Sequence, residues 1–541
     1  MPRPRHPHLS LARFSIWPQR YDHDGTTPAV SDSIEVESPG SPPAGTGSPT
    51  TGATPMPDTK EKKHLWQSPL AIFFVALALR LLGVRLFYHS TWNDYQDHLL
   101  FGYETGRIAR SIVEGHGFGN PISVPSGPTA WLTPVYPYLL AGLFKLCGVY
   151  TKTSALVILS LNSLFSALIC FPLFHMAKRS FGRGVAVTAC WIWTLYPYFI
   201  YIPGGFVWDT CLGALLVATL FLCALQLREE PASLWGWLGF GVLGGFTVLT
   251  NASALTVCFV LAAWAIFPLW QASRTPQRSL ASGISRDHWR WLSRASLVAV
   301  GLVVTLLPWQ VRNYRAFHTV VPLRDNFWLE FWDGNDGDTT SWVDIERHPT
   351  INPEEGALFA KLGEIPYMRE KRRKALDFLA LHPGLYLLQC ARRFLYLWTG
   401  FWNLDPSNLL DEFHGFANVY LTSSLTLAMF LGLWRALRNS GPLPREAFPR
   451  SSSRLGCDAG AGSDAGNVVR PASRSSREAV LPYLLVLSFY PLIFYITHPT
   501  IRHRHTIDPE VVVLAALGLR SLFRASSSKS PAVPPAAALP N

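Results

Sequence analysis

Long apolar runs separated by short polar segments make up most of this chain. A membrane-spanning helix needs about 17–25 predominantly apolar residues. Runs of that kind lie near 69–88, 154–176, 184–203, 206–227, 234–250, 252–270, 295–310, 416–436, 480–497 and 507–523. A further run, 132–149, has Pro134 and Pro137 at its start. The pattern leaves open whether this run changes sides, so it predicts an all-α polytopic membrane protein with ten to twelve spans.

Composition agrees with the apolar pattern. Of the 541 residues, 49% are hydrophobic and only 15% are charged, whereas soluble domains average about 25% charged. These values exclude a soluble enzyme, a disordered protein and a disulfide-knit secreted domain. The net charge of +11 is read as the positive-inside bias of cytoplasmic loops, not as a nucleic-acid site. The eight cysteines lie mostly inside apolar runs, without a C-x-x-C motif, which favours buried thiols.

Polar segments divide the chain into modules. Residues 1–67 are rich in Pro, Gly, Ser and Thr and lack a signal-peptide core, which predicts a disordered cytoplasmic tail. Basic residues at 178–183, 271–294 and 437–478 predict cytoplasmic loops. The expected modules are an N-terminal transmembrane module 68–310 with a first outer loop 89–131, an outer and interfacial helical region 311–415, a C-terminal transmembrane module 416–523 with cytoplasmic loop 437–478, and a tail 524–541.

The first outer loop contains a second kind of pattern. Apolar residues recur at helical spacing from His98 to Val113, which predicts an amphipathic helix at the membrane surface. Asp97 and Glu104 fall on one face, and Arg107 is three residues beyond Glu104. Such acids often form a solvated polar face. A carboxylate at the membrane boundary can also act as a general base toward an acceptor hydroxyl.

Arginines on the outer side run against the positive-inside rule. Arg312, Arg315 and Arg324 follow a span end that faces outward, and each alone is best read as a headgroup anchor. Together they suit a lipid phosphate, which Arg binds bidentately. Arg502 and Arg504 lie in the last outer turn with His503. A metal site at His498, His503 and His505 is the alternative for that turn, so a divalent metal stays open although no cofactor is assigned.

Several motifs together resemble a known family. They are the run from Phe101 to Gly148 and, further on, Pro308-Trp309, Arg312-Asn313-Tyr314, Val321-Pro322-Leu323 and Gly334-Asn335. They resemble the GT-C membrane glycosyltransferases, and most of all the bacterial relatives of protein O-mannosyltransferases and of lipid A aminoarabinose transferase. The resemblance covers roughly residues 68–523 and implies a GT-C-type fold.

The resemblance also implies roles for individual residues. Family members carry Asp-Glu at the start of the amphipathic helix, and this chain has Tyr103-Glu104. The resemblance therefore assigns the catalytic carboxylate to Glu104. The Asp of the family's pair is missing, and Asp94, Asp97 or a more distant acid is left to compensate for it. Asp209 matches a second acid of the family. Arg502-His503-Arg504 is similar to an Arg-Tyr-Arg turn and would hold the donor phosphate.

These expectations define a function and its alternatives. The resemblance implies transfer of a sugar from a polyprenyl-phosphate donor to a glycan, lipid or protein hydroxyl, with inversion, at the outer face of a bacterial inner membrane. No glycine-rich nucleotide loop is present in the sequence, which argues against a nucleotide-sugar donor. A lipid-linked sugar flippase or other transporter is the alternative class, and a catalytically dead scaffold is a third. Transporters place ionisable groups near the bilayer midplane, whereas the acids here gather in outer loops.

Overall fold

The described part of the chain is helical. The computed structural model describes residues 65–87, 101–274, 286–335, 347–402, 416–438 and 475–527. Within these ranges there is no strand, and an isolated β-bridge joins Gly119 to Pro128. The all-α class predicted from the sequence is therefore confirmed. Asp94, Asp97, most of the expected N-terminal tail and most of loop 437–478 lie outside the described residues.

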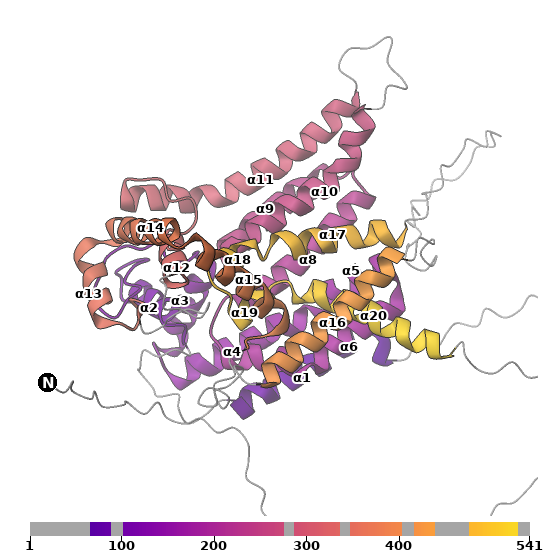
Figure 1. Ribbon diagram of the computed structural model, residues 1–541, viewed down its shortest axis with the longest axis horizontal. Coiled ribbons are helices and arrows are strands. Elements are labelled where there is room, and N and C mark those ends of the chain that lie inside the picture. The colour runs from indigo at the N-terminus through magenta and orange to yellow at the C-terminus, as the bar shows by residue number, and fades with distance from the viewer. Residues whose placement is uncertain are drawn as a thin grey trace, which may run out of the picture.

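Two groups of helices lie at opposite ends of the molecule (Figure 1). The bundle contains α1 (Pro69–Phe87), α4 (Lys152–Leu168), α5 (Cys170–Phe181), α6 (Arg183–Leu195), α7 (Pro197–Gly205), α8 (Thr210–Glu229), α9 (Leu234–Thr250), α10 (Leu255–Arg274), α11 (Arg286–Phe317), α16 (Phe416–Arg438), α17 (Ser476–Phe489), α18 (Leu492–Ile496) and α20 (Asp508–Ser527). The outer group contains α2 (Glu104–Val113), α3 (Val135–Cys147), α12 (Phe327–Asp333), α13 (Pro353–Leu362) and α14 (Glu364–Leu381), and α15 (Pro383–Thr399) and α19 (Ile501–His505) join it to the bundle.

Length and apolar composition support an integral membrane protein. Six helical segments among the described residues are long and apolar enough to cross a membrane, or seven if the bent pair α6–α7 counts as one span. The expected ten to twelve spans stay a prediction. The run 132–149 forms α3, whose 13 residues reach about 20 Å at 1.5 Å per residue. That length is short of the roughly 30 Å hydrocarbon core.

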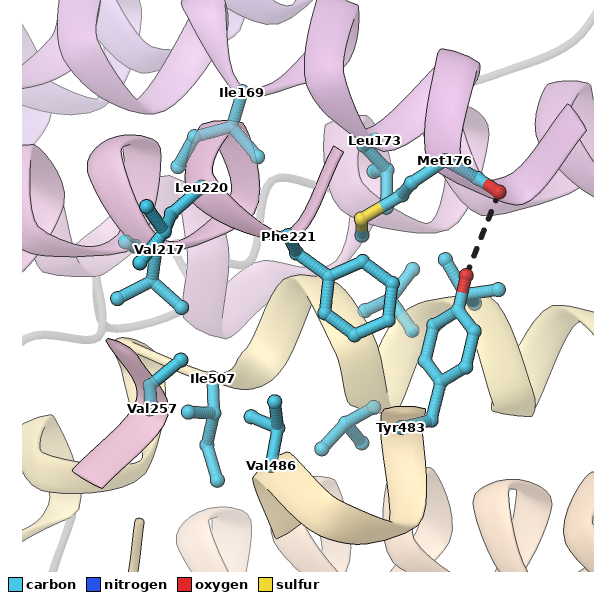
Figure 2. Close-up of a cluster of buried hydrophobic side chains, with 14 of the residues drawn as sticks. Ile169, Leu173, Met176, Val217, Leu220, Phe221, Val257, Tyr483, Val486 and Ile507 are labelled. Carbon is cyan, nitrogen blue, oxygen red and sulfur yellow. Dashed lines mark hydrogen bonds between the residues drawn. The ribbon is translucent and has the colours of Figure 1, made fainter. Parts of the chain in front are cut away.

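The two transmembrane modules share one apolar core (Figure 2). Side chains of α5 and α8, such as Leu173 and Phe221, pack there against α17 residues such as Val486. The Tyr483 hydroxyl donates to the Met176 carbonyl at 3.5 Å and lies 3.0 Å from the Ser180 hydroxyl. This contact joins segments about three hundred residues apart. It thereby holds the segment that runs from α17 to α20 against the N-terminal module.

A buried arginine supports the bend between α6 and α7. The two helices meet at 51°, because Pro197 lacks the N–H that would bond to the Trp193 carbonyl. Arg80 of α1, which is fully buried, donates to that carbonyl at 2.8 Å. It also donates to Ser166 Oγ at 2.8 Å. The hydrogen-bond partners of Arg80 are neutral oxygens, because the bend leaves a carbonyl to satisfy.

We predict that Arg80→Met lowers stability. A buried acceptor left without its donor costs about 1–3 kcal/mol, and Met fills much of the same volume without a donor. Thermal unfolding of the purified protein measures the effect. Arg85→Met is the matched control, because Arg85 lies on the same helix but is exposed. Equal unfolding temperatures for the two variants would contradict the role given to Arg80.

The segment Thr129–Trp131 forms a junction within the outer group. Its Ala130 N–H donates to Glu364 Oε1 at 2.6 Å, and Thr129 Oγ1 donates to Glu364 Oε2. On its other side the Ala130 carbonyl accepts from the Asp325 N–H at 3.3 Å. Burial raises the pKa of Glu364 well above its ordinary value, and the neighbouring Asp325 carboxyl raises that pKa further. The hydrogen bonds from Thr129 and Ala130 oppose this rise.

This junction predicts a stability that depends on pH. Above the ordinary pKa of a glutamate the unfolded chain loses the Glu364 proton before the folded chain does, so the free energy of unfolding falls as pH rises, until the raised folded pKa is passed. The slope is at most about 1.4 kcal/mol per pH unit for one group. Glu364→Gln should flatten it. Thermal unfolding across pH measures this, with Glu354→Gln, an exposed acid, as control. An unchanged slope in Glu364→Gln would contradict the assignment.

Candidate active site

A cavity of about 420 Å³ opens where the outer group meets the bundle. Its wall comes from the start of α2, the segment before α8, the segment before α10, α12 and the chain from α18 to α19. The polar residues that line it are Glu104, Asp209, Thr210, Asn251, Ser253, Arg324, Asn326, Glu330, Thr497, His498, Arg502, His503 and Thr506. Acids and arginines from segments far apart in the sequence therefore face one space.

A strained turn places Glu104 in this cavity. The expected helix from His98 begins only at Glu104 among the described residues, because Gly102 and Tyr103 have φ values of 70° and 33°. Gly102 also has no room for a side chain, since a Cβ there would lie 2.8 Å from the Val207 carbonyl oxygen. Burial raises the pKa of Glu104, whereas its backbone hydrogen bond and Arg502 act to lower it. A raised pKa suits a general base that works near neutral pH.

Asp209 lies in the same cavity, on the segment that precedes α8. Burial raises its pKa, and Arg502 and Arg324 oppose that rise. A hydrogen bond from Asn251 acts in the same direction as the arginines. The structure thus brings together the two acids, Glu104 and Asp209, that the sequence singled out from separate loops.

Arg502 lies flat on the indole of Trp208. Its guanidinium carbon is 3.6 Å from the ring centroid, and Trp208 in turn stacks on Phe206 at 5.3 Å. Arg502 Nη1 is buried and has no hydrogen-bond partner within the described part of the chain. Burial lowers the pKa of Arg502, and the nearby carboxylates, Glu104 first, oppose that effect. Stacking fixes the plane of the fork and leaves its edge available for an anion.

Arg324 and His503 also line the cavity. Arg324 Nε donates to the Trp131 carbonyl at 2.8 Å, which attaches it to the junction segment Thr129–Trp131. His503 Nδ1 accepts from the Thr500 N–H at 3.0 Å, and its ring stacks on Phe494 at 4.2 Å. Burial lowers the pKa of His503 well below its ordinary value. His503 thus faces the cavity as a neutral, fixed ring.

The cavity also contains residues that were not singled out for this role from the sequence, among them Glu330, His498 and Trp208. Glu330 of α12 accepts from Asn326 Nδ2 at 2.6 Å, and His498 Nε2 lies 3.5 Å from its second oxygen. Trp208 was passed over because it reads as part of an apolar run, and His498 was considered only as a metal ligand. An acid within the aromatic segment 327–333 was the one available signal for Glu330.

The other predicted site residues lie elsewhere. Arg107 donates to the Thr350 carbonyl at 2.8 Å, Arg312 donates to the Thr129 carbonyl at 2.6 Å, and Arg315 is exposed on α11. Arg504 donates to Asp508 at 2.8 Å and to Thr426 at 3.1 Å. These contacts hold outer segments and α16 in place, away from the cavity wall. Asp97 lies outside the described residues.

The histidines of the last outer turn do not form a metal centre with neighbouring groups. Among the described residues, no group of three His, Cys, Asp or Glu side chains could hold a metal ion. His498 and His503 have ring centroids 5.6 Å apart, and each ring is held by packing and by contacts to neighbouring protein groups.

Residues 128–309 match the family model described as dolichyl-phosphate-mannose-protein mannosyltransferase. This part of the chain is similar to these glycosyltransferases. The match confirms the resemblance expected from the sequence and includes Trp208 and Asp209. The enzyme class that the sequence indicated is the class of this family. No curated protein matches the sequence.

The solved structures with some similarity to this chain are distant in sequence. The oligosaccharyltransferase of Archaeoglobus fulgidus, in a complex with Zn and sulfate, is 14% identical with a TM-score of 0.44 over 85% of this chain and 49% of its own. AglB of the same organism, with an inhibitory peptide and a dolichol-phosphate, is 15% identical with a TM-score of 0.45 over 86% and 52%. ArnT from Cupriavidus metallidurans, bound to undecaprenyl phosphate, is 14% identical with a TM-score of 0.33 over 85% and 78%. The chain spans about half the length of the archaeal proteins.

Gly102 generates a prediction about the site's construction. Gly102→Ala places a side chain on a left-handed backbone, which lowers the free energy of unfolding by about 1–2 kcal/mol. The added carbon also overlaps with Val207 and Trp208, which costs roughly 1–3 kcal/mol more. Gly115→Ala is the matched control, since Gly115 has φ 85° but no atom within 4 Å of the added carbon. Thermal unfolding of both variants measures the difference. If Gly102→Ala is no less stable than Gly115→Ala, the close approach of Gly102 to Val207 is not a constraint.

Proposed function

We propose that this chain is a membrane glycosyltransferase that moves a sugar from a polyprenyl-phosphate donor to an acceptor hydroxyl at the extracytoplasmic face. The observation that carries the proposal is the cavity in which Glu104 and Asp209 face Arg502. A carboxylate can take a proton from the acceptor, and a guanidinium can hold the departing phosphate. The family match over residues 128–309 supports the same chemistry.

The reaction follows from the positions of these groups. Glu104 accepts the proton of the acceptor hydroxyl, whose oxygen then attacks the anomeric carbon of the donor sugar. The bond from that carbon to the phosphate oxygen breaks, and polyprenyl phosphate leaves with the electron pair. Arg502 and Arg324 stabilise the charge that develops on the phosphate. Displacement in one step inverts the anomeric centre. Asp209 orients the acceptor or shares the role of base.

The distribution of cations supports an outward-facing cavity. Lys178 and Arg179 end α5, Arg435 and Arg438 end α16, and Arg520 lies near the end of α20. These helix ends lie at the side of the bundle away from α12 to α14 (Figure 1). By the positive-inside rule that side is cytoplasmic. We place the protein in a bacterial inner membrane, with the cavity at the opposite surface and the donor lipid in the adjoining leaflet.

A flippase or other transporter is the competing class, and one assay separates it from an enzyme. The purified chain is reconstituted with a polyprenyl-phosphate hexose and a soluble glycoside as acceptor. An enzyme releases polyprenyl phosphate and forms a new glycoside. A transporter moves the intact lipid across the bilayer, with neither product.

Glu104→Gln is predicted to abolish transfer without loss of folding. The amide keeps the size of the side chain but accepts no proton, and a general base contributes about 10²–10⁴-fold. Release of polyprenyl phosphate by the variant measures the loss, and Asp209→Asn serves as the comparison. Wild-type activity should rise with pH through the raised pKa of Glu104. Near-normal turnover in Glu104→Gln would move the catalytic role to Asp209 or Asp97.

Arg502→Met and Arg504→Met should separate two functions in one turn. Arg502 lines the cavity, and its buried Nη1 has no hydrogen-bond partner among the described residues, so its loss should weaken donor binding by about tenfold to a hundredfold. Arg504 donates hydrogen bonds to Asp508 and Thr426. Its loss should therefore mainly lower the unfolding temperature, with a smaller effect on donor affinity. Donor titrations and thermal unfolding of both variants give the answer. Unchanged donor affinity in Arg502→Met would refute the phosphate assignment.

A further inference from the structure

Glu330 is an unusual residue to find in a cavity that receives a phosphate. The cavity already contains the carboxylates Glu104 and Asp209, and Glu330 acts to raise the pKa of Glu104. An ionised carboxylate only accepts hydrogen bonds. Glu330 therefore repels the phosphate. Its presence indicates that another part of the ligand donates a hydrogen bond to it.

The carboxyl of Glu330 is fixed on one side only. Asn326 Nδ2 donates to Oε1 at 2.6 Å, and Arg324 Nη2 lies 4.0 Å from the same oxygen. The second oxygen has a longer contact, 3.5 Å, to His498 Nε2. Because Oε1 is already bound, Oε2 is the atom with capacity for a donor from a ligand.

His498 gives an independent indication of a binding site. It lines the cavity and is only 7% exposed. Burial lowers its pKa to about 3, so the ring is neutral at physiological pH. Its Nδ1 has no hydrogen-bond partner within the described part of the chain. A buried polar atom without a partner is costly, and a ligand hydroxyl, which both donates and accepts, would satisfy such a ring together with the adjacent carboxylate.

We propose that Glu330 and His498 form a recognition site for a hydroxyl group of the donor sugar. This inference rests on the proposed function and adds to it a residue pair that sets sugar specificity. One hydroxyl donates to Glu330 Oε2 and approaches the ring of His498, while the phosphate lies at Arg502. The site then selects a sugar that carries a free hydroxyl at one ring position. A site built to bond a hydroxyl strongly rejects the analogue that lacks it, because its own polar groups are left unpaired.

The test uses the full chain in lipid nanodiscs. The donors are a polyprenyl-phosphate hexose that is turned over and its monodeoxy analogues, each lacking one hydroxyl. Wild type should lose about 10²-fold or more in kcat/KM for one analogue. Glu330→Gln should lower kcat/KM for the parent donor toward the value for that analogue. The two donors should then differ by less than about tenfold in kcat/KM. Discrimination at the other positions should stay as in wild type.

Glu354→Gln is the matched control, because it removes the same charge from an exposed site on α13 outside the cavity. It should behave as wild type with every donor. Thermal unfolding of Glu330→Gln checks that the variant is folded. An equal loss for all donors in Glu330→Gln, or no discrimination among deoxy donors by wild type, would overturn the recognition role and leave the transferase proposal intact.

Equilibrium binding of the same donors by isothermal titration separates the two proposals. If wild type binds the parent donor more tightly than one deoxy analogue, and Glu330→Gln does not, the recognition site stands even where no polyprenyl phosphate is released. That combination would refute the transferase proposal alone. Equal binding of all donors by both proteins, without turnover, would overturn both.

Discussion

The cation of Arg502 organises the candidate site. The guanidinium of Arg502 lies on Trp208 and is surrounded by carboxylates from three separate segments, the start of α2, the segment before α8, and α12. Burying a charge is expensive unless charges of the opposite sign lie close to it. Each of those acids in turn benefits from the cation, since Arg502 acts to lower the pKa values of Glu104 and Asp209. The outer group and the bundle are thus joined electrostatically at the place where we assign the chemistry.

The surrounding fold holds these segments in position around the cavity. Arg80 supports the bend between α6 and α7, which leads the chain toward Trp208 and Asp209. The junction segment Thr129–Trp131 fixes Arg324 beside the cavity and holds α14 through Glu364. At α16 and α20, Gly432 and Gly518 leave no space for a side chain, so the two backbones pack closely. That packing sets the position of α20, and α19 with Arg502 precedes α20 directly.

The sequence was informative where physical patterns are local. Apolar runs gave the helical class and most helix positions, and motif resemblance gave Glu104, Asp209 and Arg502, which share a cavity. It could not separate Arg502 from Arg504, because their different partners depend on where α16 packs. Helix α2 starts at Glu104 rather than near His98 because a positive φ at Gly102 is not visible in periodicity. Glu330 and Trp208 were missed because their roles arise only when distant segments meet.

The central claim is that the donor's phosphate lies at Arg502 with its sugar between Glu104 and Glu330. Cryo-electron microscopy of the full chain with a non-hydrolysable polyprenyl-phosphonate sugar analogue tests that claim most directly. The account predicts density for the phosphonate beside Trp208 and Arg502, and density for the sugar inside the cavity of about 420 Å³. Phosphonate density at Arg504, or at Arg312 and Arg315 on α11, with the cavity empty, would contradict it.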